Sequence, residues 1–132
     1  MKIIIAGSRD ITDYSIIESG MKKIKEKYLK DVLPHGLTIL SGCARGVDTL
    51  AIQWAETHNA DVHKYPANWS HFGKSAGYRR NDQMAKHGDL LVAFWDKKSK
   101  GTEHMIKCAQ DKKIPVEVFE CPVSIALAVL WV

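Results

Sequence analysis

The sequence has few cysteines, and they are scattered. Cys43, Cys108 and Cys121 are far apart and form no CxxC spacing. An odd, scattered set argues against a disulfide framework and favours a reducing compartment. The six histidines form no HxxxH pair, and none lies near a cysteine cluster. We therefore expect no metal site, and we expect no cofactor.

Long apolar runs are also missing. The apolar stretch in residues 1–7 is too short for a secretory signal. Residues 123–132 are apolar except for Ser124, but a membrane-spanning helix needs about 20 such residues. We expect a cytoplasmic protein with no membrane contact, in which 121–132 forms an apolar C-terminal extension of the same domain. Because this extension needs cover, as an edge strand or against a partner subunit, we expect a homodimer or higher homo-oligomer.

The charge balance carries only a mild basic excess. The chain has 132 residues, 26% of them charged, and a formal net charge of +4. This length suits one core and one domain. The excess suits an anionic ligand, but the long basic stripe with interleaved aromatics that is typical of single-strand binders is absent. Nucleic acid is therefore a less favoured partner than a small nucleotide.

Strand and helix patterns alternate along the chain. We predict strands at 2–6, 37–40, 61–65, 89–95 and 115–119, and helices at 13–29, 45–58, 74–87 and 102–112. The run at 89–95 is almost entirely apolar, which is typical of a central strand buried on both faces. We expect Thr12 or Asp13 to cap the first helix, Thr102 to cap the fourth, and 67–73 to form a loop. The pattern predicts an α/β fold: a Rossmann-like, doubly wound parallel sheet of about five strands with helices on both faces.

A loop of small residues, Ser-Gly-Cys-Ala-Arg-Gly-Val-Asp at 41–48, joins the second predicted strand to the second predicted helix. Such a turn leaves backbone N–H groups and the positive end of the helix dipole facing the space above it, which favours phosphate. Arg45 adds a guanidinium that can hold phosphate oxygens in pairs. A tight turn whose glycines only relieve strain is the alternative.

The other strand ends carry similar residues. In an open parallel sheet, ligands bind beyond the carboxyl ends of the strands, so these segments should meet at one edge. Arg79 and Arg80 are further phosphate candidates, with surface salt bridges as the alternative, and Trp69 either stacks on a base or anchors its loop. The segments in question are Gly7-Ser8-Arg9-Asp10, Pro66-Ala67-Asn68-Trp69 with 73–81, and Trp95-Asp96 with 99–102.

Taken in order, these motifs resemble a known family. The series is Gly7-Ser8-Arg9, Ser41-Gly42-x-Ala44-Arg45-Gly46-x-Asp48, Pro66-Ala67-x-Trp69, Gly73-Lys74-x-Ala76-Gly77, Arg80-Asn81-x-x-Met84 and Ala93-Phe94-Trp95 with Gly101-Thr102. It is similar to the YspA-like, cpYpsA-related branch of the SLOG superfamily, which also holds the LOG phosphoribohydrolases and the nucleotide-binding fold of the DNA-processing protein DprA. The resemblance runs from about residue 3 to residue 119 and implies a Rossmann-like fold that binds nucleotides.

One position departs from the LOG pattern. LOG enzymes cleave the base from a nucleoside monophosphate and carry Gly-Thr-x-x-Glu, whereas this chain has Met105 in place of the glutamate. Glu103 lies about 200° away around the helix and cannot replace it. The catalytic residues of such a hydrolase are therefore unknown, with Asp48 and Asp96 as candidates. Asp48 is alternatively a brace for its own loop.

We therefore expect residues 1–120 to form a stand-alone domain that binds, senses or sequesters a nucleotide or nucleotide-derived ligand. Phosphates would lie near Arg45, Gly46, Gly101 and Thr102, clamped by Arg80, with the base toward Trp69. A nucleotide N-glycosidase is the alternative, and a DNA- or RNA-binding module ranks third. The expected ligand-binding residues are Gly7, Ser8, Arg9, Ser41, Gly42, Ala44, Arg45, Gly46, Asp48, Trp69, Lys74, Arg79, Arg80, Asn81, Gly101 and Thr102.

Overall fold

The structure, a computed structural model, describes residues 1–30 and 36–121. The expected apolar extension lies almost wholly outside these residues. The elements in chain order are β1 (Lys2–Gly7), α1 (Tyr14–Tyr28), β2 (Thr38–Ser41), α2 (Val47–Thr57), β3 (Asp61–Lys64), α3 (Trp69–Phe72), the 3-10 turn η2 (Gly73–Ser75), α4 (Ala76–His87), β4 (Leu90–Trp95), α5 (Lys100–Asp111) and β5 (Val116–Glu120).

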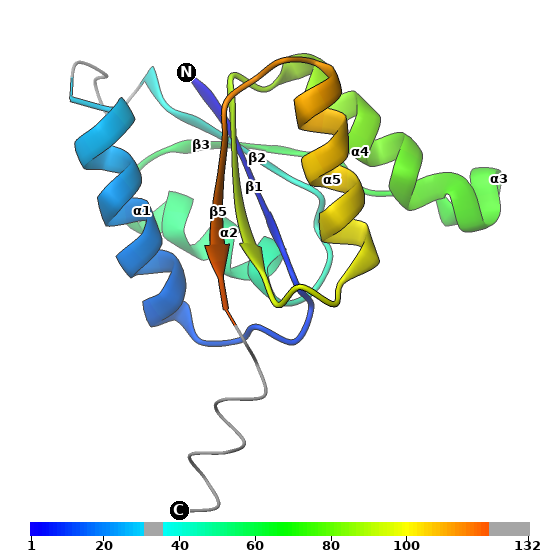
Figure 1. Cartoon of the computed structure of the whole chain (residues 1–132), viewed down its shortest axis with the longest axis horizontal. Helices are drawn as coiled ribbons and strands as arrows, with labels where there is room; N and C mark the ends of the chain where they lie inside the picture. The colour runs from blue at the N-terminus through cyan, green and yellow to red at the C-terminus, as the bar shows by residue number, and fades with distance from the viewer. Residues whose placement is uncertain (31–35, 122–132) are drawn as a thin grey trace, which may run out of the picture.

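The five strands form one parallel sheet in the order β3-β2-β1-β4-β5. Helices α1 and α2 pack on one face, and α4 and α5 pack on the other (Figure 1). The order reverses between β1 and β4, so the carboxyl ends of these two strands flank the switch point where such sheets bind ligands. The predicted α/β, Rossmann-like fold is confirmed.

Successive side chains of β1 point to opposite faces of the sheet, so the core has two layers. Ile3 and Ile5 pack with α1 and α2, while Ile4 packs with α4 and α5. All three side chains are fully buried, because β1 is hydrogen-bonded between β2 and β4 and covered on both faces. The continuous apolar run at β4 has the same cause. A rigid central pair of strands therefore holds the loops at the carboxyl edge.

Two local expectations were wrong. The fourth predicted helix begins at Lys100, and its cap is Ser99, whose side chain accepts a hydrogen bond from the Thr102 N–H at 3.3 Å. Thr102 is buried instead. The predicted loop at 67–73 contains α3, because the Asn68 side chain accepts the His71 N–H at 3.1 Å and caps this short helix. At the first helix, the expected cap Asp13 accepts the Ser15 N–H at 2.9 Å.

Helix α3 and η2 form an arm that projects from the body of the domain (Figure 1). Neither contains a buried residue. The arm leads into α4, whose inner side packs against the sheet through Met84 and Ala85. In the part of the chain that the structure describes, no helix is long and apolar enough to cross a membrane.

Candidate functional site

A polar hollow of about 450 Å³ lies at the carboxyl edge of the sheet, beside β1, β2 and β3. We call it the arginine pocket. It is built from the β1–α1 loop, the β2–α2 loop, the start of the arm and one residue of α4. Its lining residues are Arg9, Gly42, Cys43, Ala44, Arg45, Pro66, Ala67, Trp69 and Arg80.

Three guanidinium groups line this pocket, and none of them forms a salt bridge with a described residue. Arg9 and Arg45 are exposed, and Arg80 is half-buried. Within residues 1–30 and 36–121, no carboxylate lies within 4.0 Å of any of the three. The surface salt bridge that was the alternative role of Arg80 is therefore not formed in this part of the chain. Three like charges brought together by separate segments favour an anion between them.

Arg80 is held in place from two sides. Its Nη1 donates to the Gly42 carbonyl oxygen at 2.6 Å, and its Nε donates to the Asn81 Oδ1 at 3.0 Å. Burial lowers the pKa of this guanidinium, while the nearby Asp48 carboxylate opposes the shift. Gly42 is required for the close approach, because a Cβ there would lie 2.6 Å from Nη1. Arg80 is thus a fixed wall of the pocket.

A second, narrow hollow of about 70 Å³ continues from the arginine pocket toward α5. The two share Arg9, Ala44 and Arg80, so they are parts of one site. The N-terminal turn of α5 forms one side of it, although the Thr102 N–H there is already taken by Ser99. The narrow hollow is lined by Ala6, Gly7, Arg9, Ala44, Asp48, Arg80, Asn81, Met84, Ser99, Gly101, Thr102 and Met105.

Asp48 is the acidic group of the site. Its Oδ2 accepts the Ala44 N–H at 3.1 Å, so it braces the β2–α2 loop. Burial raises the pKa of Asp48 to about 6, and the Ala44 N–H and the charges of Arg80 and Arg9 only partly oppose this shift. The carboxyl group therefore changes its charge near neutral pH. It lines the narrow hollow, where a bound ligand would sense that charge.

Asp96 has a different role. Its Oδ1 accepts the N–H groups of Lys98 and Ser99, both at 2.8 Å, and its own N–H donates to the Ser8 hydroxyl at 3.1 Å. Burial opposes its ionisation, but these N–H donors outweigh burial and lower its pKa. Asp96 lines neither hollow. It fixes the β4–α5 turn and joins that turn to the end of β1.

Asn81 connects α4 to the start of α5. Its Nδ2 donates to the Gly101 carbonyl oxygen at 3.3 Å and lies 3.2 Å from the His104 Nδ1. Burial lowers the pKa of His104, which favours the neutral ring that accepts this hydrogen bond. The bonds orient the Asn81 Oδ1 toward Arg80. His104 was missed from the sequence because no spacing pattern links a residue of one helix to an amide on another.

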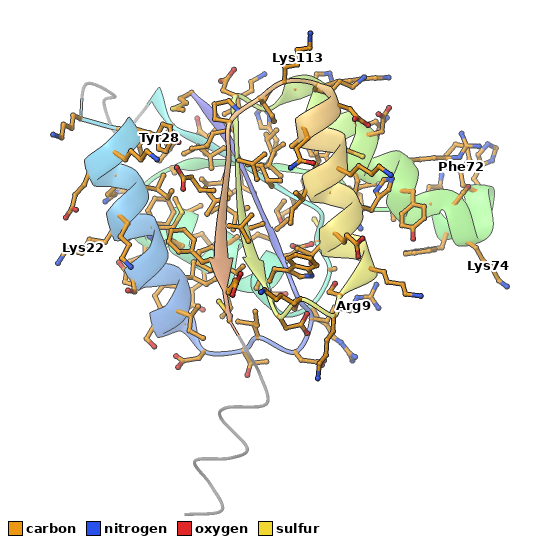
Figure 2. All side chains as sticks on the ribbon, viewed as in Figure 1. Arg9, Lys22, Tyr28, Phe72, Lys74 and Lys113 are labelled. Carbon is orange, nitrogen blue, oxygen red and sulfur yellow. The ribbon has the colours of Figure 1, made fainter. Side chains whose placement is uncertain are left out.

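The expected site residues divide into three groups. Most line the two hollows. Ser8, Ser41 and Gly46 are buried and line neither hollow; the Ser41 hydroxyl donates to the Asp48 carbonyl oxygen at 3.2 Å. Lys74 and Arg79 are exposed and also line neither, and Figure 2 shows Lys74 at the end of the arm. Seven further residues line the site although they were not among the expected binding residues: Ala6, Cys43, Pro66, Ala67, Met84, Ser99 and Met105.

A larger hollow of about 620 Å³ lies between α1 and the ends of β4 and β5. Phe94 and Phe119 form part of its wall, with ring centroids 5.2 Å apart. Among the described residues that line it, Lys23 is the single basic one, and Asp10, Asp13 and Glu120 are acidic. We call this hollow the larger groove. Its volume favours it as a binding site, but its charge does not suit an anionic ligand, for which the arginine pocket is favoured.

The chain is similar to proteins of two kinds. It is 33% identical over 121 residues to the Gene 61 protein of Mycobacterium phage D29, a match that covers 87% of this chain and 93% of that one. Its fold is similar to that of DNA processing protein A from Helicobacter pylori, with a TM-score of 0.61 and 21% identity, over 99% of this chain and 73% of that one. That structure is described as showing a single-stranded DNA binding mode.

A family profile gives the assignment. The profile of the YspA, cpYpsA-related SLOG family matches residues 1–72, which is more than half of the chain. The matched segment contains the β1–α1 and β2–α2 loops, which supply Arg9 and Arg45 to the arginine pocket. The chain belongs to the YspA, cpYpsA-related SLOG family.

Proposed function

We propose that this protein binds a nucleotide or nucleotide-derived ligand in the arginine pocket. The observation that carries the proposal is the convergence of Arg9, Arg45 and Arg80 from three separate segments, with no carboxylate within 4.0 Å in residues 1–30 and 36–121. Guanidinium groups bind phosphate oxygens in pairs through charge-assisted hydrogen bonds. A phosphate monoester, with close to two negative charges at neutral pH, suits such a site.

Trp69 supports a ligand that also carries a planar ring. Its side chain is 52% exposed and lines the pocket beside Arg80. An indole with this much exposure contributes little to stability by burial in the core, but it offers a face on which a base can stack. Such stacking contributes about 1–3 kcal/mol per base in nucleic-acid complexes. Phosphate on the arginines and a base on Trp69 together describe a nucleotide.

Calorimetric titration with AMP, GMP, CMP and UMP tests the proposal. We expect at least one of them to bind, and we expect Arg45→Glu to weaken that binding by about a hundredfold, since it replaces an attraction by a repulsion. Lys22→Glu makes the same charge change on α1, outside the pocket, and should bind as the parent protein does. Unchanged affinity in folded Arg45→Glu contradicts the proposal.

A nucleotide N-glycosidase is the second candidate, and Asp48 is the observation that favours it. This carboxyl group lines the narrow hollow, and its pKa of about 6 suits a group that exchanges a proton near neutral pH. In the reaction, water would add its hydroxyl to C1′ of the ribose as the C1′–N bond breaks, and its proton would go to the base. Release of free base that is lost in Asp48→Asn would support this activity. The buried Met105 supplies no carboxylate there.

Single-stranded nucleic acid is the third candidate. The structural neighbour from Helicobacter pylori is described by its single-stranded DNA binding, and the end of a strand presents the same phosphate and base as a nucleotide. Binding to this pocket should weaken with salt, because each phosphate contact releases counterions.

We also propose a cytoplasmic location and a homodimeric state. The dimer rests on the apolar sequence of 121–132, most of which lies outside the described residues. Sedimentation velocity of the full chain and of a chain ending at residue 121 tests it. We expect a dimer for the first and a monomer for the second, and a monomer for both contradicts the dimer.

A further inference from the structure

The arm presents two aromatic rings, and each lies beside an arginine of α4. Trp69 and Arg80 both approach Gly77, where a Cβ would lie 3.3 Å from the Trp69 Cη2 and 3.7 Å from the Arg80 Nη2. The Phe72 ring lies under the guanidinium of Arg79, with Cζ 4.5 Å from the ring centroid. The first pair lines the arginine pocket, and the second pair lies outside it.

The Phe72–Arg79 pair lies outside the core. The Phe72 ring also makes a T-shaped contact with His71, with ring centroids 4.4 Å apart, but all three side chains are exposed. Phe72 is 40% exposed, and α3 has no buried residue. The Arg79 Nε donates to the Ser75 Oγ at 3.1 Å, and within the described ranges no carboxylate lies within 4.0 Å of Arg79. The exposed Lys74 adds a further positive charge at the end of the arm (Figure 2).

We propose that the Phe72–Arg79 pair is a second nucleotide subsite, which binds the next unit of a single-stranded oligonucleotide whose terminal unit occupies the arginine pocket. The inference rests on the proposed function and specifies its ligand. In the first subsite, Trp69 takes the base and the arginines take the terminal phosphate. In the second, Phe72 takes the next base and Arg79 the phosphate that joins the two units.

The spacing of the two rings favours a single strand. Trp69 and Phe72 are three residues apart on one helix, where Cβ atoms are about 5–6 Å apart. Stacked bases in a duplex rise by about 3.4 Å. Two bases on these rings are therefore separated from each other, as in an extended strand whose bases stack on protein side chains. A duplex keeps its bases stacked and paired, and it cannot occupy both rings.

The test compares thymidine 5′-monophosphate with 5′-phosphorylated tetrathymidylate. For the parent protein, we expect the tetramer to bind about tenfold or more tightly than the monomer. Phe72→Ala should weaken tetramer binding by roughly 5- to 150-fold, the equivalent of one stacked base, and leave monomer binding unchanged. Trp69→Ala should weaken both. Val118→Ala, which truncates a similarly exposed apolar side chain on β5, is the matched control and should change neither.

Salt dependence provides a second measurement. Arg79→Ala should reduce the slope of log affinity against log salt by about 0.7 for the tetramer, the value of one phosphate contact with a single strand. It should leave the slope for the monomer unchanged.

The outcomes separate the two proposals. If the monomer binds but the tetramer binds no more tightly, or if Phe72→Ala weakens both ligands equally, the second subsite is wrong and the arginine pocket stands. If neither ligand binds and the panel of nucleoside monophosphates also fails, both proposals are wrong. Circular dichroism of Phe72→Ala should match that of the parent protein, because α3 buries no side chain.

Discussion

Arg80 donates a hydrogen bond of 2.6 Å from Nη1 to the carbonyl oxygen of Gly42, a residue 38 positions earlier in the chain. This bond joins α4, on one face of the sheet, to the loop that follows β2. It places the guanidinium where it lines both the arginine pocket and the narrow hollow. The connection between the arginine pocket and the narrow hollow therefore depends on this contact.

Removal of the Arg80 side chain should affect both stability and a neighbouring pKa. In Arg80→Ala, the buried Gly42 carbonyl oxygen loses its partner, which costs about 1–3 kcal/mol in the free energy of unfolding. The positive charge of Arg80 also holds the pKa of Asp48 down, so this pKa should rise above its present value of about 6. Urea denaturation measures the first effect, and a carbon-13 NMR titration of the Asp48 carboxyl group measures the second.

Arg79→Ala is the matched control. Arg79 is exposed, its Nε donates to the Ser75 hydroxyl and its guanidinium lies over the exposed Phe72 ring, so its loss should cost less than about 1 kcal/mol. Equal costs for the two variants, or a fall in the pKa of Asp48 in Arg80→Ala, would contradict this account of the site.

Asp48 should make stability depend on pH. Its pKa is about 6 in the folded chain, against 3.8 ordinarily, so between these values the folded state binds more protons than the unfolded state. The free energy of unfolding therefore falls as pH rises through this range, by about 3 kcal/mol in total. Asp48→Asn lacks this titration, and its amide oxygen can still accept the Ala44 N–H. Relative to the parent protein, the variant should gain about 2 kcal/mol between about pH 4 and pH 7.5.

Comparing the parent protein with Asp48→Asn removes the contributions of other titrating groups. Denaturation of both proteins at about pH 4 and at about pH 7.5 gives the difference in their free energies of unfolding directly. A stability difference that is the same at both values would show that Asp48 ionises as an exposed carboxyl group does.

Ser99 should stabilise the start of α5. Its hydroxyl accepts the Thr102 N–H and lies 3.1 Å from the Thr102 hydroxyl. Ser99→Ala should lower the free energy of unfolding by about 1 kcal/mol, as loss of a helix cap does. Lys98→Ala changes an exposed neighbour and should have little effect. Thermal unfolding of the two variants tests the assignment of Ser99 as the cap of α5. Equal melting temperatures for both variants would contradict it.

The fold was predictable because its signals are local and strong. The apolar run of β4 and the periodicity of α2 each result from burial, because buried positions are occupied by apolar residues and their spacing can be seen in the sequence. Helix α3 was missed because a four-residue helix with no buried side chain has no periodicity to detect. The cap of α5 was misassigned because Ser99 and Thr102 both carry hydroxyl groups, and only packing shows that Thr102 is buried.

The site was predictable in outline, since the carboxyl ends of parallel strands must meet at one edge. Its details depend on the direction in which each side chain points. Arg79 and Arg80 are adjacent in sequence but about 100° apart on a helix, so only Arg80 reaches the pocket. Lys74 carries the same charge as the pocket arginines, but the arm holds it away from them. Neither distinction is visible without the orientation of α4.

The central claim is that a nucleotide binds in the arginine pocket and not in the larger groove beside α1. Nitrogen-15 NMR of the labelled protein, titrated with the nucleoside monophosphate that binds best, locates the ligand by the amide signals that move. We predict shifts at Arg9, Ala44, Arg45 and the Trp69 indole N–H. Shifts confined to Ile11, Gly20 and Phe119, which line the groove, would contradict the claim.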